Sequence, residues 1–194
     1  MNASKAVLPT ISGLRPYQAS LLAGKYIETG DWMKTKVYAY EENIFETSRK
    51  STCDRYSSHF VKVLSSLDEK QLEVVAHGND KDRLAILWLG FCLSFPLIGG
   101  FAADVVSEKY RSHNLILKTE DLWEYLADKS VDYPNLSDIT DSVRSKTKCV
   151  VFYNLRDAEL LNSLDEIQPA YLSPVARELI PSVYWGFYPG EENR

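Results

Sequence analysis

The chain has 194 residues, of which 22 are Lys or Arg and 27 are Asp or Glu, so its formal net charge is −5 at pH 7. A chain of this length can bury a substantial core without disulfides or structural metals. With 45% hydrophobic and 25% charged residues it has the composition of a soluble globular protein, which excludes long disordered tracts, and its acidic balance argues weakly against a nucleic-acid ligand.

The first predicted elements are two amphipathic helices. The preceding MNASKAVLP lacks the apolar core and cleavage site of a secretory signal, so we expect a cytoplasmic protein. Apolar residues recur at helical spacing from Leu14 to Thr29, and Gly30 is expected to end that helix. Asp31 then caps a second helix that closes near Asn43. The residues expected on its inner face are Trp32, Met33, Val37 and Tyr40.

A third helix is predicted after Thr47 or Ser48, either of which can act as its N-cap. Apolar residues at spacings of three and four define its inner face, namely Cys53, Tyr56, Phe60, Val63, Leu64 and Leu67. The opposite face carries Arg55, His59 and Lys62 together with Ser58. Two helices joined by a short turn, the second with a basic outer face, have the outline of a helix-turn-helix.

In a helix-turn-helix the first residues of the second helix meet the DNA. Here these residues are SRKSTCDR. Arg49 and Lys50 can contact phosphate or guanine, and Ser51 and Thr52 can donate hydrogen bonds to phosphate. The alternative is a solvated helix face that carries charge only for solubility.

Basic residues are concentrated in two stretches of the chain. Residues 49–62 carry a net charge of +3 and residues 142–156 carry +4, which leaves −12 on the remainder. Salt screens charges over about 8 to 10 Å, so a local cluster can attract an anionic ligand although the whole chain is acidic.

The segment Leu84 to Ala103 contains 20 consecutive residues without a charge, and about 20 apolar residues suffice to cross a bilayer. Pro96 and the pair Gly99-Gly100 interrupt it, so we expect two helices that meet at a corner inside a globular core rather than a membrane span. Asn79-Asp80 caps the first of them. The helix before this segment is expected to open with a capping box over Ser66-Leu67-Asp68-Glu69 and to end at Gly78.

A second helix-turn-helix outline follows nearer the C-terminus. Thr119 is expected to cap a helix with Leu122, Trp123 and Leu126 inward, and Ser137 or Thr140 to start a long helix. The inward residues of that helix are expected to be Ile139, Val143, Thr147, Val150, Val151 and Leu155. Arg144 and Lys148 share its outer face at i and i+4, whereas Lys146 lies on another side.

The tail is expected to hold two short helices, one within Asp157 to Ile167 and one from Ser173 to Ile180. Val183 to Phe187 is expected to form either a short strand or a strap over the body.

The chain shows no constellation of catalytic groups. Its three histidines occur singly, and Cys-x-x-Cys, a glycine-rich phosphate loop and Gly-x-Ser-x-Gly are all missing from the sequence. We therefore expect no catalytic residue, no metal and no cofactor. The cysteines Cys53, Cys92 and Cys149 are far apart in apolar helical patterns and are expected to be buried free thiols.

Four stretches between Tyr17 and Leu164 resemble the BrxA family, small core proteins of BREX (bacteriophage exclusion) systems, in their order and spacing. They are YQASLLAGKYIETGDW, EENIFETSRKSTCDRY leading into FVKVLSSL, LAILWLGFCLSFPLIGGFAADVV, and DITDSVRSKTKCVVFYNLRDAELL. Members often end the last long helix with Ala-Gly-Leu, where this chain has Ala158-Glu159-Leu160, which leaves that helix boundary open.

The resemblance implies an all-α globular protein with two helix-turn-helix elements and no enzymatic activity. It also implies double-stranded DNA binding and work beside a methyltransferase, an ATPase and a phosphatase-like protein in phage defence. The alternatives are a protein-interaction scaffold within the defence complex and, because some members resemble the NusB fold, RNA binding.

From residues and resemblance together we expect one compact helical bundle and a monomer. Its regions are residues 1–78 with the first helix-turn-helix, the apolar helical pair 79–112, and residues 113–194 with the second helix-turn-helix and an aromatic tail. DNA is expected to bind mainly through phosphates, with little sequence specificity. The DNA-binding residues are Arg49, Lys50, Ser51, Thr52, Arg55, Lys62, Arg144, Lys146 and Lys148.

Overall fold

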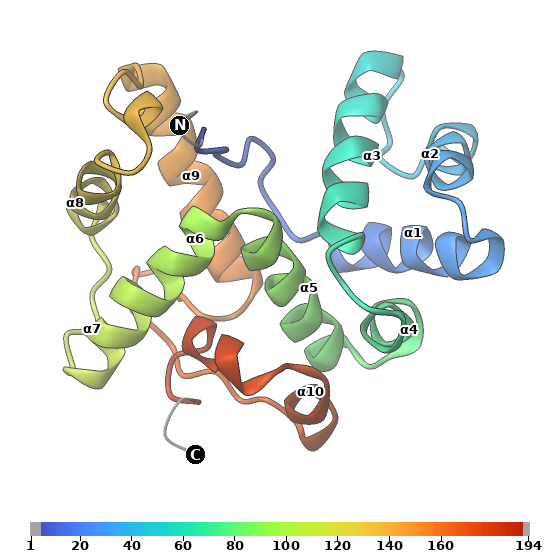
Figure 1. Ribbon diagram of the computed structural model, residues 1–194. Coiled ribbons are helices and arrows are strands. Elements are labelled where there is room, and N and C mark those ends of the chain that lie inside the picture. Colours follow the sequence, from blue (N-terminus) through green and yellow to red (C-terminus); the bar gives the residue numbers. More distant parts are fainter. Residues whose placement is uncertain (1–4, 192–194) are drawn as a thin grey trace. The chain divides into compact units, whose positions relative to one another are not determined.

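The computed structural model describes residues 5–191, and within this range the fold is all-α, as predicted (Figure 1). No strand occurs there; the β-type pairing consists of two isolated bridges, Ile116 with Glu166 and Leu161 with Ile167. The α-helices are α1 Pro16–Thr29, α2 Trp32–Glu41, α3 Lys50–Leu64, α4 Glu69–His77, α5 Asp80–Ser94, α6 Pro96–Phe101, α7 Glu108–Arg111, α8 Thr119–Lys129, α9 Asp141–Asp157 and α10 Pro174–Leu179. Three further helical turns are η1 Ala102–Ser107, η2 Pro134–Leu136 and η3 Ser182–Phe187.

The chain divides into two compact units. The N-terminal unit comprises Leu14–Ser94 together with Leu172–Pro181, and the C-terminal unit comprises Phe95–Tyr171 with residues 5–13 and 182–191. This division differs from the boundaries at residues 78 and 112 that we expected from the sequence. The reason is that the apolar segment is shared between the units, and that a short C-terminal stretch returns to the first unit.

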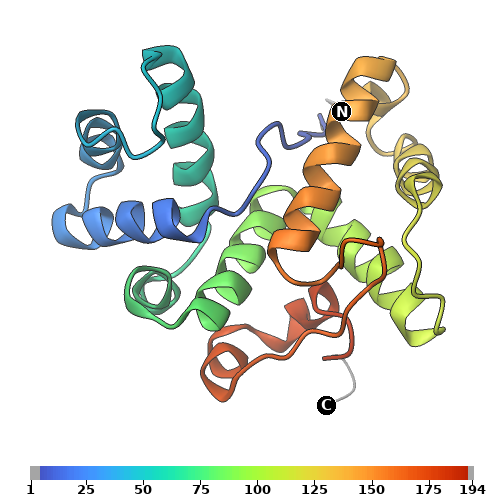
Figure 2. The same cartoon turned by 180° about the vertical axis from the view of Figure 1, so that it is seen from behind.

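The N-terminal unit is built from α1 to α5 and α10, and Figures 1 and 2 show α2 beside α3 within it. Its first two helices are bounded as predicted. Gly30 ends α1 in the left-handed region, φ 62°, and its N–H donates to the Tyr26 carbonyl. The Asp31 carboxylate accepts from the N–H groups of Met33 and Lys34 and so caps α2.

The predicted inner face of α2 is wrong. Thr35 and Ala39 are the buried residues of this helix, whereas Met33, Val37 and Tyr40 are each more than half exposed. Small side chains let α2 approach its neighbours closely, so its larger apolar residues remain on the outside. Trp32 is the exception, since its ring stacks on Tyr26 with the centroids 3.7 Å apart.

Two helix caps of the N-terminal unit also differ from prediction. Arg49, not Thr47 or Ser48, is the N-cap residue of α3, and it makes no side-chain capping bond. Helix α4 opens with a capping box between Asp68 and Gln71, two residues later than the box predicted from Ser66. Because both corrections lie at helix starts, they leave the order of helices unchanged.

Helix α10 is held to the start of α5 by a buried carboxylate. Asp82 is 4% exposed and accepts from Ser173 Oγ and Asn79 Nδ2, both at 2.6 Å. Ser173 Oγ in turn accepts from the Ala176 N–H and caps α10, the short helix that was predicted from Ser173. These contacts explain why residues 172–181, although distant in sequence, belong to the N-terminal unit.

The apolar segment is split as predicted. Helix α5 ends at Ser94, Phe95 is non-helical with φ −129° and ψ 75°, and Pro96 opens α6. Among the described residues no single helix has the length and apolar character of a membrane span, and α5 meets that criterion only when it is joined with Pro96–Arg111 across Phe95. Most of the segment is buried, including Leu89, Phe91 and Ile98.

In the C-terminal unit, α6, η1 and α7 form one continuous helix whose middle turn is a π-helix. Two ion pairs connect it to α8: Lys109 Nζ lies 3.0 Å from an Asp121 carboxylate oxygen, and Lys129 Nζ lies 3.6 Å from Asp104. Thr119 was predicted to be the N-cap of α8 but is the first residue of the helix; the N-cap is Lys118, whose N–H donates to the Asp121 side chain. These contacts fix α8 in place.

The rest of the C-terminal unit corrects the predicted tail. Thr140 caps α9 through the Val143 N–H, which decides between the two predicted caps. No helix forms within residues 158–167 beyond the end of α9, and Ser182–Phe187 is a 3₁₀ helix rather than a strand. Cys149 is exposed, contrary to prediction, whereas Cys53 and Cys92 are buried free thiols.

Candidate nucleic-acid interface

The first basic stretch lies on α3, which residues 42–49 join to α2. Arg49, Lys50 and Ser51 are exposed at its start, and Thr52 is half-buried. Further along the helix, Ser51, Arg55, Ser58 and Lys62 are exposed at i, i+4, i+7 and i+11. Residues at this spacing share one face of a helix, so these four side chains form a polar stripe along α3, hereafter the α3 stripe.

Lys36 of α2 joins the α3 stripe, which the sequence did not predict. Its Nζ donates to Ser58 Oγ at 3.2 Å and so brings a third cation beside Arg55 and Lys62. Only the pairing of α2 with α3 brings Lys36 there. The sequence shows that Lys36 is a basic residue of the second helix, but it does not show that Lys36 contacts Ser58 of the third.

Two arginines flank the Tyr56 ring. The guanidinium carbons of Arg15 and Arg55 lie 4.8 and 5.6 Å from its centroid, within the range of a cation–π interaction. These contacts restrict both side chains and hold Arg15, which precedes α1, near the first half of α3. Arg15 was also missed, since it is separated from the basic stretch by more than 30 residues of sequence.

Two titratable groups on α3, His59 and Lys62, have lowered pKa values. Burial, with a smaller contribution from the charge of Lys62, lowers the pKa of His59 from 6.5 to about 4. Its ring packs edge-on against Phe60 and tilted against Phe91. Partial burial also lowers the pKa of Lys62. His59 is thus neutral at pH 7 and adds no charge to the α3 stripe.

The second basic stretch is spread over several sides of α9. Arg144 and Lys146 are exposed, and Lys148 is half-buried with its Nζ 5.1 Å from the Phe152 ring centroid. Lys146 shares a face with exposed Cys149 and Tyr153, at i+3 and i+7, away from Arg144. Arg156 forms an ion pair with Asp165. The three predicted residues of α9 therefore do not form one surface.

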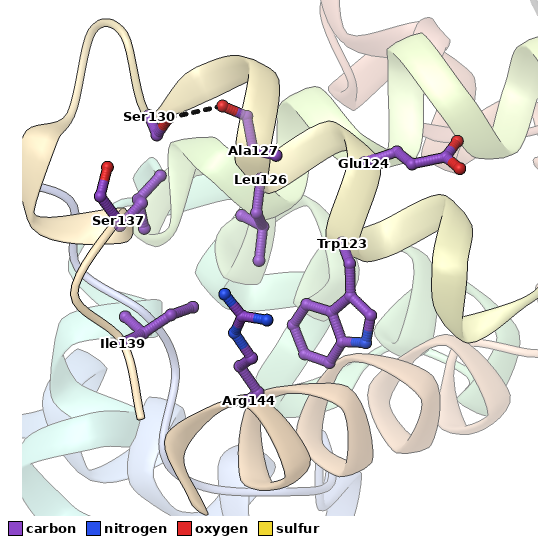
Figure 3. A pocket seen from close by; sticks show the side chains of 9 residues that line it. Trp123, Glu124, Leu126, Ala127, Ser130, Ser137, Ile139 and Arg144 are labelled. Carbon is purple, nitrogen blue, oxygen red and sulfur yellow. Dashed lines mark hydrogen bonds between the residues drawn. The ribbon is translucent and has the colours of Figure 1, made fainter. Parts of the chain in front are cut away.

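Arg144 lines a pocket between α8 and the start of α9 (Figure 3). The pocket has a volume of about 360 Å³ and also includes Trp123, Leu126, Leu136 and Ile139.

Among the described residues no group of three or more His, Cys, Asp or Glu side chains is arranged to hold a metal ion. The exposed groups of the two basic stretches are mainly cations, hydroxyls and the Tyr153 ring, with the Asp54 carboxylate and the Cys149 thiol.

Comparisons with known proteins agree on one family. The model of the BrxA family matches residues 14–182. The protein named BREX protein BrxA from Escherichia coli O9:H4 (strain HS) is 24% identical over 140 residues, which cover 71% of this chain and just under two thirds, 66%, of that protein. A crystal structure of an uncharacterized protein from Magnetospirillum magneticum superposes with a TM-score of 0.73 at 17% identity, covering 87% of this chain and 86% of that one. This last likeness concerns the fold alone.

Proposed function

The chain belongs to the BrxA family, and from this premise we propose that it is a non-enzymatic, double-stranded DNA-binding component of a bacterial BREX phage-defence system. Its protein partners are then the other BREX proteins, among them the methyltransferase, the ATPase and the phosphatase-like protein. We propose that it acts as a cytoplasmic monomer.

The observation that supports DNA binding best is the α3 stripe with Lys36. Two cations and two hydroxyls follow one face of α3, and Lys36 of α2 adds a third cation. Arg49 and Lys50 are exposed next to them at the helix start. Lys and Arg neutralise phosphates, and Ser hydroxyls donate to phosphate oxygens. Helices α2 and α3 then correspond to a helix-turn-helix whose second helix meets the DNA.

The composition of this surface favours phosphate contacts over base readout. The exposed residues of the α3 stripe include no Asn or Gln, the side chains that pair with adenine. The exposed carboxylate of Asp54 lies beside the stripe and limits the number of phosphates that can approach. We therefore expect affinity to fall steeply with salt and to vary little with sequence.

The test is charge reversal within the stripe. Arg55→Glu with Lys62→Glu is expected to weaken binding to a duplex of about 20 base pairs at least tenfold and to reduce the slope of log K against log salt by about two, because two phosphate contacts are lost. Fluorescence anisotropy at several salt concentrations measures both quantities.

Lys70→Glu with Lys81→Glu is the matched control. It makes the same change of charge in the same unit, at two exposed lysines outside the stripe. If wild type binds no duplex at low salt, or if both double variants bind equally well, the proposal is wrong. Tighter binding of structured or single-stranded RNA than of duplex DNA would favour the NusB-like alternative.

One observation favours a scaffold as the second candidate function. Met33, Val37 and Tyr40 form an exposed apolar row on α2 at i, i+4 and i+7. Such a row is typical of a helix face that packs against a partner protein. Replacing all three by Ser is expected to abolish co-purification with BREX partners and to leave DNA affinity unchanged, whereas Arg55→Glu with Lys62→Glu is expected to do the reverse.

A further inference from the structure

The pocket on α8 and α9 combines an aromatic wall with a cation. The Trp123 indole comes from α8 and the Arg144 guanidinium from the first turns of α9, and Figure 3 shows both directed into the same space. Leu126, Leu136 and Ile139 supply apolar walls, and Ser137 adds a hydroxyl. A planar apolar group and an anion can therefore bind there side by side.

The cation in this pocket has no counter-charge of its own. Within residues 5–191, the guanidinium of Arg144 forms no hydrogen bond or ion pair, although Glu124 lines the same pocket; the hydrogen bond of this residue is made by its backbone N–H, which donates to the Thr140 carbonyl. Figure 3 shows the Glu124 carboxylate directed away from the guanidinium. The nearby Arg156, in contrast, is paired with Asp165. Arg144 is thus available to an external anion.

The size and chemistry of the pocket restrict the ligand. A volume of about 360 Å³ is near the lower end for small-ligand sites, which excludes a bulky occupant. An aliphatic side chain would fill the apolar walls but leave Arg144 without an anion. A nucleotide satisfies both halves, because a base stacks on an indole and a phosphate pairs with a guanidinium.

We propose that this pocket receives one unpaired nucleotide of a DNA strand, with its base against Trp123 and its phosphate at Arg144. The proposal rests on the DNA binding proposed above and adds a ligand to the C-terminal unit. A base inside an intact duplex cannot enter, because both of its faces are stacked and its edge is paired. The pocket therefore distinguishes bulged, frayed or flipped nucleotides from paired ones.

The experiment compares four DNA ligands with the full chain. They are a fully paired duplex, the same duplex with one bulged adenine, the bulged duplex with an abasic unit in place of that adenine, and free dAMP. Wild type is expected to bind the adenine bulge about 5- to 100-fold more tightly than the abasic bulge, the gain of one stacked base. Anisotropy titrations at fixed salt measure the ratio.

Three variants test the two halves of the pocket. Trp123→Ala is expected to abolish the preference, and Trp123→Phe to retain most of it, since a phenyl ring still stacks. Arg144→Gln is expected to weaken both bulged duplexes alike. Ala127→Phe fills the pocket from an exposed position without removing core atoms and is expected to abolish the preference in a protein that still folds.

The control is Tyr153→Ala, which removes an exposed aromatic ring of α9 outside the pocket and is expected to change nothing. Equal affinity of wild type for the adenine and abasic bulges overturns the proposal, even when duplex binding itself is confirmed. Saturable binding of dAMP without a preference for the bulged adenine overturns it too, since the ligand would then be a free nucleotide. Failure to bind any duplex would instead count against the proposed function.

Discussion

Glu159 adopts a left-handed backbone conformation, φ 60°, at the end of α9. Its N–H donates to the Arg156 carbonyl and the Leu160 N–H donates to the Leu155 carbonyl, both at 2.9 Å. This pair of bonds is the Schellman motif, whose left-handed position is usually glycine. The sequence Ala158-Glu159-Leu160 thus has a charged residue where the resembled family often has Gly, and the structure identifies this position as the helix end.

Replacing Glu159 by Gly is expected to stabilise the fold by about 1 kcal/mol, because Gly adopts the left-handed conformation without a steric penalty from Cβ. Urea unfolding followed by circular dichroism measures the difference. Glu159→Ala is the control, since it removes the carboxylate but keeps Cβ. If Ala stabilises as much as Gly, the effect comes from charge and not from backbone conformation.

His59 is expected to make stability depend on pH between about 4 and 6.5. Its pKa is about 4 in the folded protein against 6.5 for the free side chain, so the unfolded chain binds the proton first as the pH falls. The stabilisation is complete above pH 6.5 and is lost progressively toward pH 4, up to about 3 kcal/mol.

Urea unfolding at pH 7, 6 and 5 tests this dependence. His59→Gln is expected to flatten the profile over that range. The matching change at His77, an exposed residue on α4, is expected to leave it as steep as in wild type. A wild-type profile that is flat from pH 7 to 5 would contradict the assignment of the low pKa to His59.

The sequence predicted the exposure of single basic and hydroxyl residues better than it predicted which of them lie together. Arg49, Lys50, Ser51, Arg55 and Lys62 are all exposed, as surface contacts require. The sequence did not provide Lys36 or Arg15, because their places depend on contacts between α2 and α3 and around Tyr56. The sequence did predict that Lys146 lies on another side of its helix than Arg144, because the two are two residues apart.

At the level of elements, the packing of α6 against α8 depends on Gly100. A Cβ at this position would collide with the Tyr125 hydroxyl, and Tyr125 is buried with its ring against Phe101. Burial, together with the charge of Asp104, raises the pKa of Tyr125, so the hydroxyl stays protonated. A glycine within a helix is here required by the close approach of another side chain.

Gly100→Ala is expected to destabilise the protein by about 1 to 3 kcal/mol through overpacking. Adding Tyr125→Phe is expected to restore part of the loss, because it removes the colliding oxygen. Thermal unfolding of both single variants and the double variant gives the coupling energy. The control is Gly24→Ala in α1, which meets nothing within 4 Å and is expected to stabilise slightly. Additive effects of Gly100→Ala and Tyr125→Phe would contradict the proposed contact.

Helices with clear start and stop residues were the easiest elements to predict. Asp31 caps the helix expected of it, Thr140 is one of the two caps expected for α9, and α10 begins directly after Ser173, where a helix was expected. The stretch after Asp157 was wrongly predicted to be helical, because its bonds go to distant partners: Leu117 N–H donates to the Asp165 carbonyl and Ile167 N–H to the Leu115 carbonyl. Local spacing of apolar residues contains no information on such pairing.

For the molecule as a whole, the apolar segment supplies the buried centre of both units. Leu89 is fully buried, whereas Leu164 is 74% exposed. Leu89→Asp is expected to unfold the N-terminal unit, because it buries an unpaired charge, and Leu164→Asp to change stability by less than about 0.5 kcal/mol. Circular dichroism and analytical gel filtration without detergent distinguish the two. A folded Leu89→Asp variant would mean that α5 is not a core helix.

The overall class of fold was predictable from composition and helical spacing, and the break at Phe95 from Pro96 and the two glycines. The composition of the units was not predictable. Ser173 and Asp82 are 91 residues apart in sequence, and neither is unusual in its local context. Family resemblance indicated a DNA-binding role, but the pocket beside Trp123 emerges only when α8 and α9 are placed together.

The discontinuity of both units has a consequence for synthesis on the ribosome. Helix α10 belongs to the N-terminal unit and residues 182–191 belong to the C-terminal one, so neither unit has all of its described parts before these residues have emerged. Because the ribosome adds about 5 to 20 residues per second, several seconds pass between the synthesis of the apolar α5 and α6 and the synthesis of the last segments that pack in their units. A nascent chain stalled before residue 172 therefore presents unsatisfied apolar surface to chaperones and proteases, and premature termination there yields no independently complete half.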